Sequence, residues 1–124
     1  MSDPEIEDLV GDGSPSFEHV LSCVFGVRDH ESRAYLALLD NPGSTVSELA
    51  DALDRDRSNV NRSLSTLREK GLVERRRRLL DSGGYVYQYT AISVPEAKRR
   101  LHDALDAWVA DVHDAIDAFE PDER

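Results

Sequence analysis

Polar side chains that can form hydrogen bonds with nucleic-acid bases are concentrated in one stretch of the chain, residues 57–68. Asn and Arg side chains can each form two hydrogen bonds with the edge of adenine or guanine in a DNA major groove. Short hydroxyl side chains suit bases or phosphates. The candidates in this stretch are Arg57, Ser58, Asn59, Asn61, Arg62, Ser65 and Arg68. We expect both asparagines and Arg62 to contact bases, with Ser58 and Ser65 supporting them.

A second group of candidates begins with four consecutive arginines, Arg75, Arg76, Arg77 and Arg78. We expect them to hold the DNA backbone or the minor groove, together with the tip residues Ser82, Gly83, Gly84 and Tyr85. Side chains alternate along a strand, so Arg75 and Arg77 point one way and Arg76 and Arg78 the other. One pair is then expected to face DNA, and the pattern does not say which. The alternative is an edge strand that its charges protect from aggregation.

The pattern of apolar residues around these candidates predicts two helices joined by a tight turn. The apolar stripes at helical spacing are Leu49, Ala50 and Leu53 in the first helix, and Val60, Leu64 and Leu67 in the second. Ser44 or Thr45 caps the first helix, and both are also candidates for DNA contact. Asp56 caps the second helix, and Gly71 ends it. This is a helix-turn-helix.

An extended segment follows the second helix at once. Residues 72–80 form the first run, residues 81–84 (Asp-Ser-Gly-Gly) have turn chemistry, and residues 85–92 are rich in aromatic and β-branched side chains. A hairpin directly after the second helix is a wing. The expected fold class is mainly α with a β-hairpin wing: a winged helix-turn-helix with an additional N-terminal helix and a long C-terminal dimerisation helix.

The stretch SELADALDRDRSNVNRSLSTLREKGLVER resembles the winged helix of archaeal TrmB-like regulators and of related MarR-like or ArsR-like proteins. The resemblance covers about 50 residues, and the LxxKGLVxR ending is typical of winged helices in general. It implies a single winged-helix transcriptional regulator that binds specific double-stranded DNA. The long sugar-binding domain of full-length TrmB proteins has no counterpart in this sequence, so the resemblance implies no sugar ligand. The rival hypothesis is a winged helix that docks other proteins through its acidic C-terminal helix.

The charge of the chain is unevenly distributed. The whole sequence has a net charge of −10, yet residues 45–92 contain nine Arg or Lys and seven acids, a net charge of +2 that leaves −12 elsewhere. Only Lys70 and Lys98 are lysines, and Asp is more frequent than Glu. This composition resembles that of haloarchaeal proteins. In molar salt the Debye length falls to about 3 Å, so affinity would depend on close hydrogen bonds and shape.

The chain as a whole divides into three expected parts. Residues 1–15 are an acidic flexible tail, residues 16–93 the winged helix-turn-helix, and residues 94–120 an amphipathic dimerisation helix. Within the second part we expect a helix at 16–25 capped by Ser16 and a helix at 28–39 capped by Asp29. Phe17, Val20, Leu21 and Val24 would form the apolar face of the first of these helices.

The last helix has an apolar seam at heptad spacing. Its members are Leu101, Leu105, Trp108, Val112, Ala115 and Phe119. We expect this seam to pair with the same helix of a second subunit, although packing on its own domain is the alternative. A homodimer would bind a pseudo-palindromic site with half-sites near one helical turn apart.

Cys23 is the only cysteine, which excludes an intrachain disulfide. Free cysteines usually pack as small buried hydrophobes. On a helical wheel, however, Cys23 lies away from the apolar face and next to His19. A protonated imidazole would favour the reactive thiolate, so Cys23 is a candidate redox sensor.

Other classes of function have little support in the sequence. His102 and Asp106 are four residues apart and form one ligand-type pair, but no His-x₃-His or Cys-x₂-Cys spacing occurs, so we expect no metal and no other cofactor. Phosphate-binding loops and nucleophile motifs are absent, so we expect no catalytic residue and no enzyme. The N-terminus is acidic and the apolar runs are short, which predicts a cytoplasmic protein without a membrane span.

Overall fold

A computed structural model describes residues 15–122, and the chain divides into two compact units, residues 1–92 and 93–124. The elements of the first unit are α2 (Phe17–Phe25), α3 (Asp29–Asp40), α4 (Val46–Leu53), α5 (Arg57–Glu69), β1 (Val73–Leu79) and β2 (Tyr85–Ala91). The second unit contains α6 (Val94–Ala118). This order of elements confirms the expected fold class, mainly α with a β-hairpin wing, an additional N-terminal helix and a long C-terminal helix. The tail proposed for residues 1–15 lies almost wholly outside the described residues.

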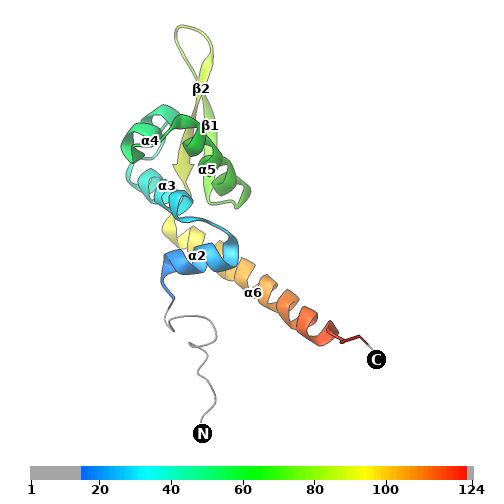
Figure 1. Ribbon diagram of the computed structural model, residues 1–124. Coiled ribbons are helices and arrows are strands. Elements are labelled where there is room, and N and C mark those ends of the chain that lie inside the picture. Colours follow the sequence, from blue (N-terminus) through cyan, green and yellow to red (C-terminus); the bar gives the residue numbers. More distant parts are fainter. Residues whose placement is uncertain (1–14, 123–124) are drawn as a thin grey trace. The chain divides into compact units, whose positions relative to one another are not determined.

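The core of the first unit lies where α3, α4 and α5 pack against one another and against the hairpin (Figure 1). Its least exposed side chains include Leu38 of α3, Leu49 of α4 and Leu64 of α5. Each buried aliphatic side chain of this size contributes about 1.5–3 kcal/mol relative to an exposed one. The apolar stripes of the sequence therefore mark the core correctly, with Leu53 only half-buried at its edge.

Side-chain caps fix where α4 and α5 begin. The Thr45 hydroxyl accepts a hydrogen bond from the Glu48 N–H at 3.1 Å, and the Glu48 carboxylate accepts one from the Thr45 N–H at 2.9 Å. This reciprocal pair satisfies two donors at the helix start. The Asp56 carboxylate accepts from the N–H groups of Ser58 and Asn59 in the same way. Thr45, and not Ser44, is therefore the cap of α4, and Asp56 is confirmed as the cap of α5.

The start of α3 differs from the expected one. Asp29 lies in the first turn, and the N-cap residue is Arg28, whose backbone N–H donates to the Glu31 carboxylate at 2.8 Å. Glu31 is only 2% exposed. The expectation failed because Asp is a strong cap residue in general, whereas here a carboxylate three residues further on satisfies the free N–H.

A short bridge joins the hairpin to the loop before α4. The Tyr89 N–H donates to the Ser44 carbonyl at 2.8 Å, and the Gly43 N–H donates to the Tyr89 carbonyl at 2.9 Å. The Ser44 hydroxyl in turn donates to the Asn41 carbonyl at 2.7 Å. Three segments, residues 43–44, β2 and β1, therefore lie side by side at the base of the hairpin, with β1 and β2 antiparallel.

The second unit is built on the long helix α6. Ser93 caps α6 by accepting from the Glu96 N–H at 3.3 Å. Hydrogen bonds from Arg99 and Arg100 lower the pKa of Glu96 to about 2. No helix among residues 15–122 combines the length and the apolar character needed to cross a bilayer.

Tyr35 of α3 ties the helices to the end of the hairpin. Its hydroxyl donates to the Ile92 carbonyl at 2.9 Å, and the side chain is buried. Burial raises the pKa of Tyr35, which keeps the hydroxyl protonated and able to donate.

Replacing this tyrosine should destabilise the fold measurably. Tyr35→Phe leaves the buried Ile92 carbonyl without its donor, so the free energy of unfolding should fall by about 1–3 kcal/mol. Urea denaturation followed by circular dichroism measures this change. Tyr85→Phe is the matched control, because Tyr85 is exposed, and equal stability of the two variants would contradict the assignment.

Candidate functional site

Helix α5 has two stripes with the same spacing. Its buried residues are Val60, Ser63, Leu64 and Leu67. Its exposed polar residues at the corresponding offsets are Ser58, Asn61, Arg62 and Ser65. Each set follows the i, i+3, i+4, i+7 pattern of one helix face. Burial of the first stripe in the core therefore directs the second, here called the polar stripe, into solvent.

Asn59 lies beside the polar stripe and not within it. It is half-buried, and its side-chain oxygen accepts a hydrogen bond from the Arg62 guanidinium at 3.0 Å. The contact holds Arg62 against α5 in the free protein. Of the residues expected to contact bases, Asn61 and Arg62 thus lie on the outward face, and Asn59 on its flank.

The start of α5 is connected to the first turn of α4. The Arg57 guanidinium donates to the Ser47 hydroxyl at 3.1 Å. Among the other candidates, Arg68 is exposed near the end of α5, Thr45 is half-buried and Ser44 is buried. Ser47 was not singled out in the sequence, although its place two residues after the α4 cap was a usable signal.

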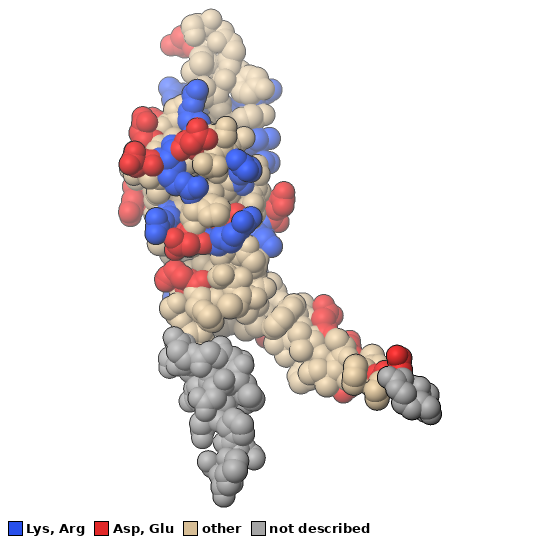
Figure 2. Space-filling view, in the orientation of Figure 1, with Lys and Arg blue, Asp and Glu red and all other residues tan. Residues whose placement is uncertain are grey.

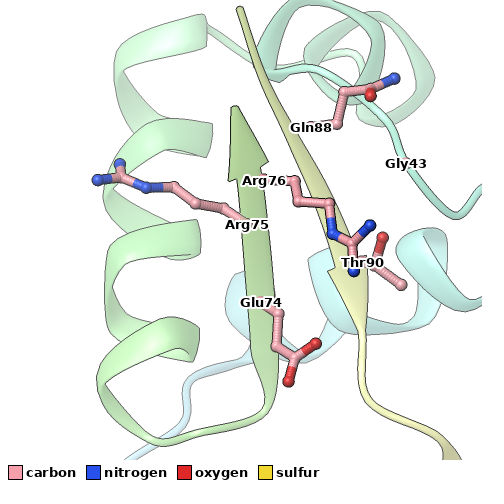
Figure 3. A pocket seen from close by; sticks show the side chains of 6 residues that line it. All are labelled: Gly43, Glu74, Arg75, Arg76, Gln88 and Thr90. Carbon is pink, nitrogen blue, oxygen red and sulfur yellow. The ribbon is translucent and has the colours of Figure 1, made fainter. Parts of the chain in front are cut away.

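The hairpin lies next to the polar stripe. Thr45, Asn61, Arg75 and Tyr87 line one surface hollow of about 420 Å³ between the helix-turn-helix and the hairpin. Figure 3 shows Arg75 and Arg76 leaving β1 in opposite directions, with Arg75 on the side of α5. Arg76 lines a second hollow, of about 450 Å³, with residues such as Gln88 and Thr90. The alternation expected for the four arginines is present.

The hairpin tip is open to solvent. Ser82, Gly83 and Gly84 are exposed, and Tyr85 is 48% exposed. Both glycines have positive φ, +93° and +79°, and nothing lies within 4 Å of a Cβ built on either. The turn therefore needs glycine for its backbone conformation and not for lack of space.

On the face shown in Figure 2, Lys and Arg side chains lie on the first unit, with Asp and Glu side chains interspersed among them. The exposed seam of α6 has a different character, since Trp108 is 48% exposed and Phe119 is 74% exposed. Leu101, Leu105 and Val112 are half-buried, and Ala115 is exposed. Val109 and Ile116, also exposed, widen the apolar stripe beyond the expected seam.

Cys23 is exposed in α2. Its sulfur lies 3.5 Å from Nε2 of His19, one turn earlier. Cys23 is therefore not packed in the core, where free cysteines usually lie. Among residues 15–122, no group of three or more His, Cys, Asp or Glu side chains is placed to hold a metal ion.

The family model described as "Sugar-specific transcriptional regulator TrmB" matches residues 21–94, which include the whole helix-turn-helix and hairpin. The protein belongs to the TrmB family. The match places it among winged-helix transcriptional regulators and confirms the resemblance noted in the sequence.

Several similar proteins come from archaea. An uncharacterized protein of Methanocaldococcus jannaschii, MJ1503, is 30% identical over 105 residues, which are 85% of this chain and 80% of that protein. A possible transcriptional regulator from Methanosarcina mazei has a TM-score of 0.71 at 25% identity, covering 82% of this chain and 87% of that one. The archaeal chromatin protein TrmBL2 has a TM-score of 0.61 at 22% identity, covering 80% of this chain and 34% of that protein.

One further polar group of this TrmB-family chain was not foreseen. Ser63 is 2% exposed within the buried stripe of α5, and its hydroxyl has no hydrogen-bond partner among the described residues. Serine is usually exposed at protein surfaces, so the expected buried stripe of α5 contained only its apolar residues, Val60, Leu64 and Leu67.

Proposed function

We propose that this TrmB-family protein regulates transcription by binding specific double-stranded DNA as a homodimer. The observation that supports it most directly is the polar stripe of α5. Four exposed polar side chains stand opposite a fully buried stripe and beside a hairpin rich in arginine. A helix presented in this way fits a DNA major groove. At the level of the fold, TrmBL2 is described as a DNA-binding protein.

In this proposal the contacts divide by type. Asn61 and Arg62 form hydrogen bonds with base edges, while Ser58 and Ser65 bind bases or nearby phosphates. Asn59 releases Arg62 when the guanidinium turns to a base. One pair of the hairpin arginines and the glycine-rich tip of the hairpin hold the backbone or the minor groove. Arg57, Arg68 and Thr45, the cap of α4, complete the surface, whereas Ser44 is buried and is left out of it.

The length of α5 and the seam of α6 support the homodimer. One short helix covers only a few base pairs, so a long specific site needs two copies. Two-fold symmetry then predicts a pseudo-palindromic site with half-sites about 34–36 Å apart or a multiple of this. The α6 seam supplies an apolar face for pairing, because Trp108 and Phe119 are exposed in the single chain.

DNA binding is tested by selecting a preferred site from genomic fragments and measuring affinity by fluorescence anisotropy. Asn61→Ala should weaken discrimination at one base position by about 1–3 kcal/mol and leave binding to random DNA largely unchanged.

The dependence on salt is a separate prediction. Most acidic residues lie outside residues 45–92 and repel DNA at low salt, and KCl screens this repulsion. Binding should therefore persist as KCl rises toward molar concentration.

Asn41→Ala is the control, since it removes an exposed asparagine outside α5. Equal losses for Asn61→Ala on selected and random DNA would contradict base contact. Absence of wild-type binding at every KCl concentration would favour the rival function, a winged helix that docks other proteins.

Dimerisation is tested by light scattering and sedimentation in molar KCl. Truncating a tryptophan that is buried on association costs about 3–5 kcal/mol, so Trp108→Ala should shift the protein toward monomer. Asp114→Ala, on the opposite face of α6, should have no effect. A monomeric wild-type protein at micromolar concentration would refute the homodimer.

We further propose that oxidation of Cys23 is the signal. Peroxide would transfer one oxygen atom to the thiolate and leave as hydroxide, giving a sulfenic acid. That group would then condense with Cys23 of the partner subunit, releasing water and forming a disulfide, where the two Cα atoms come within about 4.4–6.8 Å. The exposure of Cys23 and its contact with His19 support this proposal.

Peroxide should therefore change the DNA affinity of the wild type and leave Cys23→Ser unchanged. A non-reducing gel, run in parallel, distinguishes the sulfenic acid from the disulfide-linked dimer. An identical response of both proteins would remove Cys23 as the sensor.

A further inference from the structure

The two faces of the hairpin differ in the side chains that accompany their arginines. In the strand register, Arg75 is opposite Tyr89 and Arg77 is opposite Tyr87. The other face pairs Arg76 with Gln88 and Arg78 with Val86. Both arginines of the first face thus stand opposite a tyrosine, and neither arginine of the other face does.

Both arginines of the first face stack on a tyrosine ring. Cζ of Arg75 lies 3.9 Å from the centre of the Tyr87 ring, and Cζ of Arg77 lies 5.0 Å from that of Tyr85. The two rings contact each other edge to face, with centroids 5.4 Å apart. We call these four residues the Arg–Tyr ladder. Each arginine stacks on the ring one step nearer the tip than its directly opposite neighbour, a diagonal contact between strands.

The Arg–Tyr ladder is on the same side of the hairpin as the polar stripe. Arg75 and Tyr87 line the hollow of about 420 Å³ that Asn61 and Ser47 also line. Arg76 lines only the other hollow, which Arg75 also borders, together with the acidic residue Glu74 (Figure 3). Within residues 15–122, no ring is stacked on Arg76 or Arg78.

We propose that Arg75 and Arg77 are the hairpin arginines that bind DNA phosphates, and that Tyr87 and Tyr85 are positioning residues that hold them ready. This inference rests on the proposed DNA-binding function and names the contacts of its wing. Arg76 and Arg78 contribute no direct contact.

The chemistry of the guanidinium explains why a stacked arginine suits this role. A ring engages the flat face of the guanidinium, while its five N–H donors point outward in the plane and stay free for phosphate oxygens. Stacking also removes part of the rotamer freedom of the long side chain before DNA arrives. Less entropy is then lost on binding. The hollow between the ladder and α5 leaves room for a backbone that enters beside the polar stripe.

The test is a double-mutant cycle on the full chain, with affinity for selected and random DNA measured at one fixed KCl concentration. Arg75→Ala should weaken binding to both DNAs about tenfold, the size of one charge-assisted contact. Arg76→Ala, the matched control on the opposite face, should weaken it less than twofold. Tyr87→Leu should weaken binding about two- to fivefold, and Tyr87→Phe, which keeps the ring, should restore it.

The decisive measurement is Tyr87→Leu in the Arg75→Ala background. If the ring acts through Arg75, the second substitution adds no further loss. Additive losses, or equal losses for Arg75→Ala and Arg76→Ala, would overturn the inference while leaving DNA binding itself intact. Thermal melting identifies variants that fail to fold. If Tyr87→Leu fails to fold, the same cycle is measured on the exposed pair Tyr85 and Arg77. A wild type that binds neither DNA would remove the proposed function together with this inference.

Discussion

Burial of one stripe of α5 is the constraint on which the arrangement of the first unit depends. Val60, Leu64 and Leu67 are almost completely enclosed by α3, α4 and the hairpin. A helix whose apolar stripe is fixed in this way has no rotational freedom about its own axis, because any turn would expose leucine and bury arginine. The outward direction of the polar stripe is thus a result of core packing, although none of the core residues belongs to the proposed DNA surface.

The helix caps determine where α4 and α5 begin. Thr45 and Asp56 set the first residues of α4 and α5, so the turn between the helices has a defined length. Asp54 adopts a left-handed conformation there, with φ of +52°, which Asp tolerates better than most residues. Local hydrogen bonds therefore fix where each helix begins, and the core fixes which way it faces.

The sequence was sufficient for the order of elements, the core stripes and the identity of the family, because these depend on periodicity and on short-range capping. It was insufficient for features that depend on contacts between distant residues. The Ser44–Tyr89 bridge, the Tyr35–Ile92 hydrogen bond and the side of the hairpin that faces α5 belong to this class. Alternation along β1 separated the arginines into two pairs, but only the register with β2 shows which pair meets the tyrosines.

The hairpin is anchored at one end and unconstrained at the other. Its base is tied to the loop before α4 through Gly43, Ser44 and Tyr89, whereas a side chain added at Gly83 or Gly84 would meet no neighbouring atom. Residues inserted at the tip would therefore lengthen the wing without displacing α5. Related proteins can diverge in wing length, and so in how far along the duplex each wing extends, while keeping the same helix-turn-helix.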